Sequence, residues 1–412
     1  MRYERLAGIY GERGAKAQAA RYEDLIARHR AIYGDRGELT FVSAPGRAEI
    51  AGNHTDHNRG RVLASAVDLD IVAVVSPNDR KAVTLHSVGY RRPFVVDLNE
   101  LAPRPAERES SAALIRGVAA RMEALGHPVG GFDAVADSAV YKGSGLSSSA
   151  AFEVMVCAAF DALYCGFALD RKLRAKIARY AENEYFGKPC GLMDQMASSV
   201  GGLVGIDFRR EDPDVEALTY DFAAKGLTPV VVSAGGEHGN LTAEYASMPE
   251  EMRAVAARFG ESALREVDPA ELVAAIPRLK GKVSDRAILR ALHFIDEDAR
   301  VPELIGALKR DDVGAFLKGI VASGESSWKL LQNIYTRGGD NQEIALALEL
   351  SRRILEGRGA WRVHGGGFAG TILAFVPDDA LPRYAKAISD VFGPSSVTRL
   401  TLRPVGAEAF PA

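Results

Sequence analysis

The sequence is poor in cysteine and has almost no charge excess, and both features exclude classes of protein. Its only cysteines are Cys157, Cys165 and Cys190, and no CxxC pair occurs in the 412 residues. This argues against a disulfide framework or a thiolate zinc site and favours free thiols in a reducing compartment. Lys and Arg number 51 against 54 for Asp and Glu, a net charge of −3. We therefore expect neither nucleic acid nor a membrane surface as a partner.

Long apolar segments and the common nucleotide motif are also missing. No uncharged apolar run approaches the roughly 20 residues of a membrane helix, and the charged start of the chain lacks the apolar core of a signal peptide. We expect a cytoplasmic protein, monomeric or weakly homo-oligomeric. The P-loop pattern GxxxxGK[ST] occurs nowhere, and no internal repeat is present.

The hydrophobic pattern predicts a mixed α+β protein of two lobes. Apolar, β-branched runs predict strands near 39–50 and 62–75, on either side of a polar loop, and an apolar helix follows the loop at 142–149. Strands and helices mix without a regular βαβ alternation, which favours α+β over a doubly wound sheet. We expect an N-terminal lobe over 1–212 and a C-terminal lobe over 213–412, with the active site in the cleft between them.

A glycine and serine loop precedes the apolar helix. The segment GSGLSSSAAFEV places Gly143 and Gly145 before three serines, Ser147 to Ser149. Glycine permits backbone conformations in which successive N–H groups converge on one anion, and the start of the next helix favours phosphate. Serine hydroxyls bond phosphate oxygens or Mg²⁺. The alternative is a capped helix after a tight turn, although capping requires only one hydroxyl.

A second glycine cluster, HGGGFAG, matches GxGxxG through Gly365, Gly367 and Gly370. It fails as a dinucleotide fingerprint because a strand-like run, TILAFV, follows it instead of a helix. Two interpretations remain. The cluster is either a turn between strands or a place where the backbone closely approaches a ligand or the first glycine loop.

The polar loop GRAEIAGNHTDHNRG carries short amide, carboxylate and imidazole side chains between two strands. Sugar hydroxyls both donate and accept hydrogen bonds, and fixed groups of this kind discriminate them well. A zinc site at His54, Asp56 and His57 is an alternative, but the spacing matches no known zinc motif. The other alternative is a solvated hairpin with no binding role.

Two carboxylates are candidates for the chemistry. Glu182 lies late in a predicted helix, where most glutamates are simply solvated. Asp194 is the only carboxylate in the weakly polar stretch 187–205. It is either a helix cap or a base directed at a substrate hydroxyl.

Taken together, these segments resemble galactokinases, which belong to the superfamily that also holds homoserine, mevalonate and phosphomevalonate kinases. APGRAEIAGNHTDHNRG resembles the sugar-binding segment, KGSGLSSSAAFEV the phosphate loop, AENEYFGKPCGLMDQMAS the segment with the metal-binding Glu and catalytic Asp, and VHGGGFAGTILAFV the third motif. The resemblance covers most of the chain in the family's order. It implies ATP-dependent phosphorylation of a sugar at its C1 hydroxyl, with Mg²⁺.

The resemblance also assigns roles to individual residues. Asp194 would be the base, and Arg47 would hold the sugar hydroxyl and stabilise charge in the transition state. Ser149 and Glu182 would bind Mg²⁺. The remaining assignments are ATP phosphate contacts at Gly143, Ser144, Gly145, Leu146, Ser147, Ser148 and Ser149, and sugar contacts at Asn53, His54, Thr55, Asp56 and Tyr245.

Departures from the family pattern concern the sugar. Asn53 stands where most members have Glu, Glu49 where Asn is usual, and His57 at the common Tyr position. Because the family's Glu is understood to bond the C6 hydroxyl, we expect Asn53 to contact that hydroxyl more weakly. N-acetylgalactosamine, arabinose or a uronic acid are alternative substrates. A catalytically dead sugar sensor is a further alternative, although Ser147 to Ala151 are intact.

Overall fold

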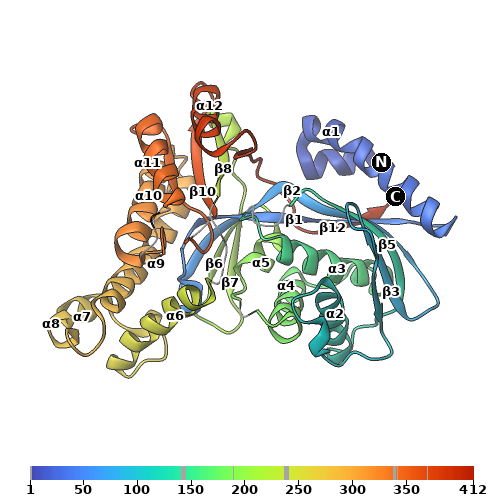
Figure 1. Cartoon of the computed structure of the whole chain (residues 1–412), viewed down its shortest axis with the longest axis horizontal. Helices are drawn as coiled ribbons and strands as arrows, with labels where there is room; N and C mark the ends of the chain where they lie inside the picture. The colour runs from blue at the N-terminus through green and yellow to red at the C-terminus, as the bar shows by residue number, and fades with distance from the viewer. Residues whose placement is uncertain are drawn as a thin grey trace.

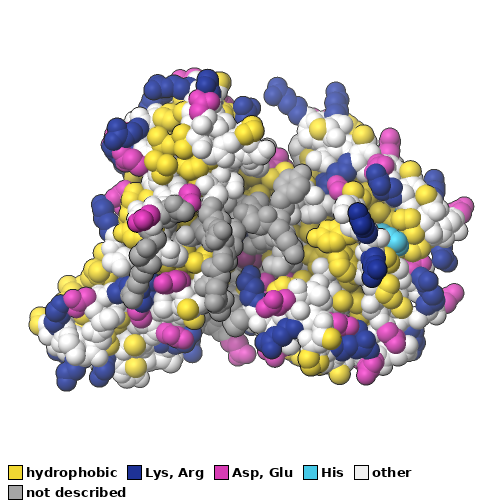
Figure 2. Space-filling view, in the orientation of Figure 1, with side chains coloured by type: hydrophobic (Ala, Val, Ile, Leu, Met, Phe, Trp, Pro, Cys, Tyr) yellow, Lys and Arg dark blue, Asp and Glu magenta, His cyan; other side chains and the backbone are white. Residues whose placement is uncertain are grey.

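The computed structural model describes residues 2–140, 145–188, 190–235, 241–336, 340, 342–368 and 370–412. These residues form one eight-stranded sheet, one four-stranded sheet and the helices around them (Figure 1). The mixed architecture confirms the predicted α+β class. Figure 2 shows basic and acidic side chains interspersed over the face in view.

The large sheet is built on two long strands. Its path runs β12-β1-β2-β5-β3-β4, and β6 and β7 extend it from the first half of β2. All its ladders are antiparallel except β3 with β5. The strands are β1 (Thr40–Ala51), β2 (Arg61–Pro77), β3 (Ala82–Ser87), β4 (Phe94–Asp97), β5 (Phe132–Ser138), β6 (Leu203–Asp207), β7 (Asp214–Leu218) and β12 (Glu408–Pro411).

Helices cover both faces of this sheet, which explains why β1 is buried along almost its whole length instead of alternating. α1 (Arg2–Tyr33) lies on one face, where Tyr22 packs on Phe41 and Phe410 (Figure 1). The opposite face carries the other N-terminal helices. These are α2 (Ser111–Ala124), α3 (Ser148–Tyr164), α4 (Arg171–Tyr180) and α5 (Met193–Val200).

The four-stranded sheet has the order β11-β8-β10-β9, all antiparallel. Its strands are β8 (Leu227–Gly235), β9 (Ala360–Val363), β10 (Gly370–Pro377) and β11 (Val397–Arg399). Around it and beyond it lie α6 (Thr242–Ala256), α7 (Pro269–Ala274), α8 (Ile276–Leu279), α9 (Asp285–Lys309), α10 (Val313–Ser326), α11 (Glu343–Leu355) and α12 (Leu381–Phe392). The β9–β10 connection carries the second glycine cluster.

Strands of the large sheet lie on both sides of residue 213. β6 and β7 pair with each other across that point, and β12, at the end of the chain, pairs with β1. An ion-pair group also joins the large sheet to α9, because Arg61 and Arg265 each bond both Asp207 and Asp298. The boundary at 212/213 therefore cuts through a sheet and stays an approximate division.

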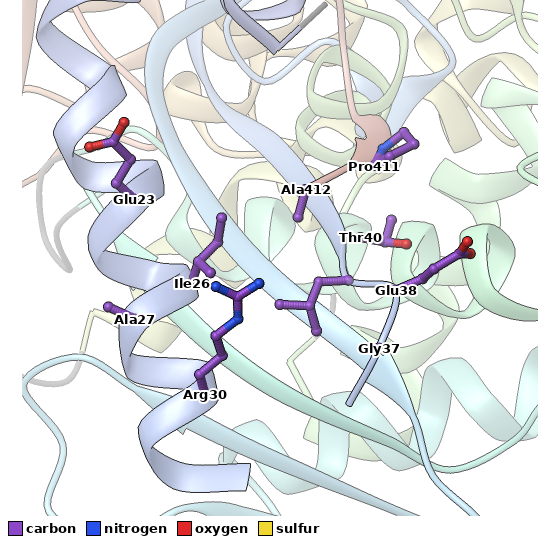
Figure 3. A pocket seen from close by; sticks show the side chains of 10 residues that line it. Glu23, Ile26, Ala27, Arg30, Gly37, Glu38, Thr40, Pro411 and Ala412 are labelled. Atoms are coloured by element: carbon purple, nitrogen blue, oxygen red, sulfur yellow. The ribbon is translucent and has the colours of Figure 1, made fainter. Parts of the chain in front are cut away.

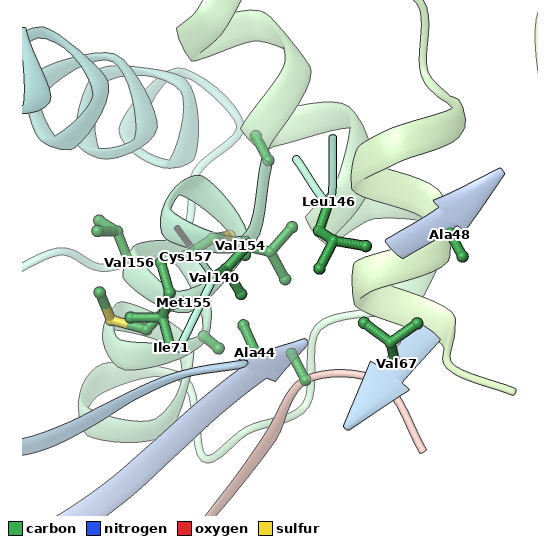
Figure 4. Packing of buried hydrophobic residues seen from close by; sticks show 14 of the residues in the cluster. Ala44, Ala48, Val67, Ile71, Val140, Leu146, Val154, Met155, Val156 and Cys157 are labelled. Atoms are coloured by element: carbon green, nitrogen blue, oxygen red, sulfur yellow. The ribbon is translucent and has the colours of Figure 1, made fainter. Parts of the chain in front are cut away.

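Leu146 anchors the described end of the glycine and serine loop in the main core. Its side chain is buried, as are those of its neighbours Ala48, Val67 and Val154 in Figure 4. The backbone carbonyl of Leu146 accepts a hydrogen bond from the Arg47 N–H at 3.0 Å. The loop is thus fixed to β1 immediately before α3 begins.

Candidate active site

An arginine and aspartate pair lies at the centre of the candidate site. Arg47 Nε donates to Asp194 Oδ1 at 2.7 Å and Nη2 donates to Oδ2 at 3.0 Å, a bidentate arrangement. Ser147 Oγ donates to the same carboxylate, and Arg47 Nη1 donates to the Gly145 carbonyl. The structure thus brings Arg47 and Asp194 together, although 146 residues separate them.

Local structure explains how the two side chains meet. Arg47 follows an irregularity in β1, where the register with β2 shifts between Pro45 and Arg47, and such bulges redirect side chains. Asp194 is in the first turn of α5, where the helix dipole favours a negative charge. Burial would raise the pKa of Asp194, but the charge and hydrogen bonds of Arg47 outweigh it and the pKa lies below its usual value. The carboxylate is therefore ionised at neutral pH.

A serine and glutamate pair forms a second polar group close by. Ser149 Oγ, in the first turn of α3, donates to Glu182 Oε1 at 3.0 Å. Glu182 belongs to a π-helical turn, Ala181–Phe186, and such turns are frequent at functional sites. Its other oxygen accepts a hydrogen bond from Gln195 Nε2 at 2.8 Å, and Lys188 Nζ lies 3.4 Å from Oε1.

These oxygens fit a magnesium ion. Mg²⁺ is usually held in kinases by one or two protein carboxylates together with the substrate phosphates, so Glu182 with the Ser149 hydroxyl is a suitable donor set. Within the described residues there is no cluster of three or more His, Cys, Asp or Glu side chains suited to a metal. The zinc alternative at His54, Asp56 and His57 therefore has no such cluster to support it.

The described part of the phosphate loop lies directly against the third motif. Gly145 has a φ of +72°, and a Cβ placed there would lie 2.3 Å from Thr371 Oγ1 and 2.9 Å from His364 Nδ1. Only glycine allows this approach. The second glycine cluster is a turn between β9 and β10, as one interpretation held, and its close approach to the first glycine loop, part of the other interpretation, is seen at Gly145. Gly143 and Ser144 lie outside the described residues.

The polar loop contains two kinds of side chain. Asn53 and Thr55 are fully buried and bond to protein groups, while His54 and Asp56 keep exposed surface. His54 Nε2 lies 3.1 Å from the Gly366 carbonyl. Burial, aided by the nearby imidazole of His57, lowers the pKa of His54 to about 3, so the ring is neutral at neutral pH.

Two further contacts bring the predicted sugar-binding residues toward the catalytic segments. A Cβ placed on Gly191 would lie only 1.9 Å from Asp56 Oδ2, so the Asp56 carboxylate sits against the chain that leads into α5. Tyr245 donates from its hydroxyl to the Gly367 carbonyl at 3.0 Å, and its ring covers Gly366. The polar loop, α5 and the third motif thus converge.

Sequence reasoning missed Lys188 and Gln195. Lys188 and Asp194 are the only charged residues in the stretch 187–205, so the argument that singled out Asp194 applies equally to Lys188. Gln195 had no signal of its own. Its amide bonds both Glu182 and the buried Glu153, a bridge that depends on the packing of α3 against α5.

The cavity in Figure 3 is a different place on the molecule. It has a volume of about 560 Å³ and lies between α1 and the ends of β1 and β12. Its charged lining residues, Glu23, Arg30 and Glu38, have mixed sign, and none of the predicted site residues lines it. We assign it no part in the chemistry.

Comparison with known proteins defines the class. Residues 113–202 match the GHMP kinases N terminal domain, and residues 27–77 match the galactokinase galactose-binding signature. Lactococcus lactis galactokinase complexed with galactose shares the fold with a TM-score of 0.81 at 21% identity, covering 94% of this chain and 99% of that one. Methanococcus jannaschii mevalonate kinase gives a TM-score of 0.61 at 17% identity, covering 89% and 99%. The fold is that of a GHMP kinase.

Sequence relatives identify the family within this class. The galactokinase of Streptomyces coelicolor is 32% identical over 372 residues, which are 89% of this chain and 91% of that protein. The galactokinase of Streptomyces lividans is 33% identical, covering 86% of each chain. The chain therefore belongs to the galactokinase family and is a sugar kinase.

Proposed function

We propose that this chain transfers the γ-phosphoryl group of ATP to the C1 hydroxyl of galactose, producing galactose 1-phosphate and ADP. The observation that carries the proposal is the bidentate Arg47–Asp194 pair beside Ser147, directly before the helix whose start is the predicted phosphate site. The pair would bring the proposed base and a cation next to the proposed phosphate loop, which supports the proposal because positioning and electrostatic stabilisation supply most of the catalysis of phosphoryl transfer.

In the proposed step, Asp194 takes the proton of the C1 hydroxyl while that oxygen attacks the γ-phosphorus. The bond from the γ-phosphorus to the bridging oxygen breaks, and ADP leaves with its electron pair. The lowered pKa of Asp194 keeps the base ionised before the reaction. Arg47 orients the carboxylate and offsets negative charge on the transferring group, because its Nη atoms carry further N–H donors beyond those bonded to Asp194 and Gly145.

Ser149 and Glu182 would hold Mg²⁺. When bound, the ion neutralises charge on the triphosphate. Gln195 fixes one Glu182 oxygen by a hydrogen bond. Lys188 places a positive charge near the other oxygen, in addition to that of the ion. The N–H groups of the described loop residues, Gly145 to Ser149, would contact the phosphates together with Gly143 and Ser144.

For the sugar, His54, Asp56 and Tyr245 are the proposed direct contacts. His54 is neutral, and its Nε2–H donates to the Gly366 carbonyl, so its Nδ1 is left as an acceptor for a sugar hydroxyl. Asp56 accepts from the His57 N–H with one oxygen and has its other oxygen beside Gly191. Direct sugar contact by Asn53 and Thr55 stays a prediction. Both side chains are buried and bonded to protein groups, so we do not include them among the proposed direct contacts.

The test is an ADP-release assay over a panel of acceptors: galactose, N-acetylgalactosamine, arabinose, galacturonic acid, 1-deoxygalactose and homoserine. We expect galactose to give the highest kcat/KM and 1-deoxygalactose to give none, since it lacks the accepting hydroxyl. A higher kcat/KM for another sugar would replace the substrate but keep the kinase. Binding of ATP and galactose without ADP release would favour the sensor.

We also propose a cytoplasmic protein, monomeric or weakly homo-oligomeric, that uses no nucleic acid or membrane partner. The cysteines support this, because Cys157, Cys165 and Cys190 are all free thiols. In the described part of the chain, no helix is long and apolar enough to cross a membrane.

A further inference from the structure

Asn53 has no hydrogen-bonding position left for a ligand. Its Nδ2 donates to Glu49 Oε1 and to the Gly365 carbonyl, both at 2.8 Å. Its Oδ1 accepts from Asn333 Nδ2 at 2.8 Å and from Ser327 Oγ at 3.2 Å. A side-chain amide has two N–H donors and two acceptor lone pairs, so all four positions are filled. The side chain has no exposed surface.

The four partners come from segments that are far apart in sequence. Glu49 lies on β1 and Gly365 in the turn between β9 and β10. Ser327 and Asn333 lie in and just after the π-helical turn Ser327–Leu331 that ends α10. Asn53 therefore joins the polar loop to the third motif and to the helical part of the chain with one side chain.

Two more hydrogen bonds strengthen the junction that Asn53 forms with its four partners. The Asn53 carbonyl accepts a hydrogen bond from His293 Nε2 of α9 at 2.9 Å. Asn333 donates from the same Nδ2 to the Gly366 carbonyl at 3.1 Å, which is also the partner of His54. A change at Asn53 is thus expected to move His54 and the glycine turn as well.

Glu49 supplies the carboxylate of this junction, and Arg362 neutralises it. Arg362 Nη2 donates to Glu49 Oε1 at 2.8 Å, and both side chains are buried. A buried carboxylate that loses its partner is strongly destabilising, so the position of this charge is tightly constrained. A carboxylate at position 53 would lie within hydrogen-bonding distance of the Glu49 carboxylate.

We infer that Asn53 is a positioning residue that fixes the polar loop against the Gly365–Gly367 turn, and that it does not itself contact the sugar. The inference rests on the proposed function and revises one of its predicted contacts. For Asn53 to bond a sugar hydroxyl, one of its four bonds would have to break and leave a buried partner unpaired, which is unfavourable. Glu49 and Asn53 act as a matched pair whose residue types are exchanged relative to the family pattern.

The first experiment compares galactose with 6-deoxygalactose in the wild type and in Asn53→Ala. We expect Asn53→Ala to lower kcat/KM for both sugars by about tenfold or more, with the two losses equal to within about twofold, because a lost positioning effect does not depend on C6. A loss confined to galactose would show direct contact with the C6 hydroxyl and overturn the inference.

Asn58→Ala is the matched control. Asn58 is equally buried in the same loop, but it bonds Met252 Sδ and the Leu264 N–H instead of the third motif. We expect its unfolding temperature to fall while kcat/KM at 25 °C changes less than about twofold. Equal kinetic losses in Asn53→Ala and Asn58→Ala would reduce Asn53 to a general stability role and also overturn the inference.

The second experiment needs no turnover. Asn53→Glu alone places two carboxylates together, whereas the double variant Glu49→Asn/Asn53→Glu restores one amide and one carboxylate. We expect the single variant to lower the folding equilibrium constant by about 100-fold or to be insoluble, and the double variant to recover at least about tenfold or regain solubility. No recovery would overturn the pairing of Glu49 with Asn53. A wild type that phosphorylates no sugar would refute the proposed function, and this experiment would still decide the inference.

Discussion

The region around Asp194 and the region around Asn53 are both rich in polar side chains, but they use them differently. At Asp194 the carboxylate is paired with the buried Arg47, but 29% of the Asp194 side chain remains exposed. At Asn53 every donor and acceptor of the amide is filled by the protein, and the side chain is 0% exposed.

This difference separates groups that can react from groups that hold them in place. A base must reach its proton directly or through one water, so some exposure is required. A residue that fixes a loop gains from full burial, because hydrogen bonds in a low dielectric are stronger and an unpaired partner is costly. Substitutions in the first region should therefore act mainly on kcat, and those in the second on the geometry shared by all substrates.

The largest expected effect is at Asp194. Asp194→Ala should lower kcat by at least about 10²-fold, the low end of general-base contributions. It also leaves the buried Arg47 without its partner, so the unfolding temperature should fall. Steady-state kinetics well below the unfolding temperature and a thermal melt on the same sample check both parts. Near-normal turnover would show that proton abstraction by Asp194 is not essential. The region around Asp194 would then no longer differ from the region around Asn53 in its role.

Arg47→Ala should lower kcat by a similar factor and also change the pH dependence. In the wild type, Arg47 keeps the pKa of Asp194 below its usual value of 3.8, so activity is retained as the pH falls until that lowered pKa is reached. Without Arg47, burial remains and raises the pKa of Asp194, so the acidic limb of the kcat/KM profile should move to higher pH. If the acidic limb does not move, it reflects the ionisation of a group other than Asp194.

Gly145→Ala tests the close approach of the two glycine motifs. The new methyl group would collide with Thr371 and His364, and overpacking of this kind costs about 1–3 kcal/mol in the free energy of unfolding. Gly126→Ala is the control, since Gly126 also has a positive φ, +81°, but a Cβ placed there would meet no atom within 4 Å. The free energies of unfolding of the two variants, measured with denaturant, separate the cost of the collision from the cost of the backbone strain that both share. Equal losses would mean that the motifs are not in firm contact.

The smallest effects are expected at the magnesium donors. Ser149→Ala and Glu182→Ala should raise the Mg²⁺ concentration needed for half-maximal activity by at least about tenfold, in the range found when metal sites lose supporting groups. Titration of Mg²⁺ binding by calorimetry in the presence of a non-hydrolysable ATP analogue gives a second measurement. Unchanged titrations for both variants would remove them from the metal site.

Local patterns were sufficient for much of the fold. The β-branched runs at 39–50 and 62–75 are β1 and β2, and the apolar run after the serines is α3. These are long, strongly patterned segments, for which the identity of an element is readable from sequence. β12 was not predicted, because four residues at the end of the chain carry no periodicity and pair only with a strand some 370 residues earlier.

The sequence alone determined the family and singled out Asp194, Arg47, Ser149 and Glu182 as candidate site residues, because they lie in motifs whose order and spacing are visible in one dimension. Only the tertiary structure decided which polar side chains of the 46–60 loop remain available. Asn53 and His54 are adjacent and equally polar, yet three of the four side-chain partners of Asn53 lie 274 to 312 residues away, and His54 keeps exposed surface. The physical reason is that a hydrogen bond is satisfied by whatever group packing brings within reach, and no local pattern records that partner.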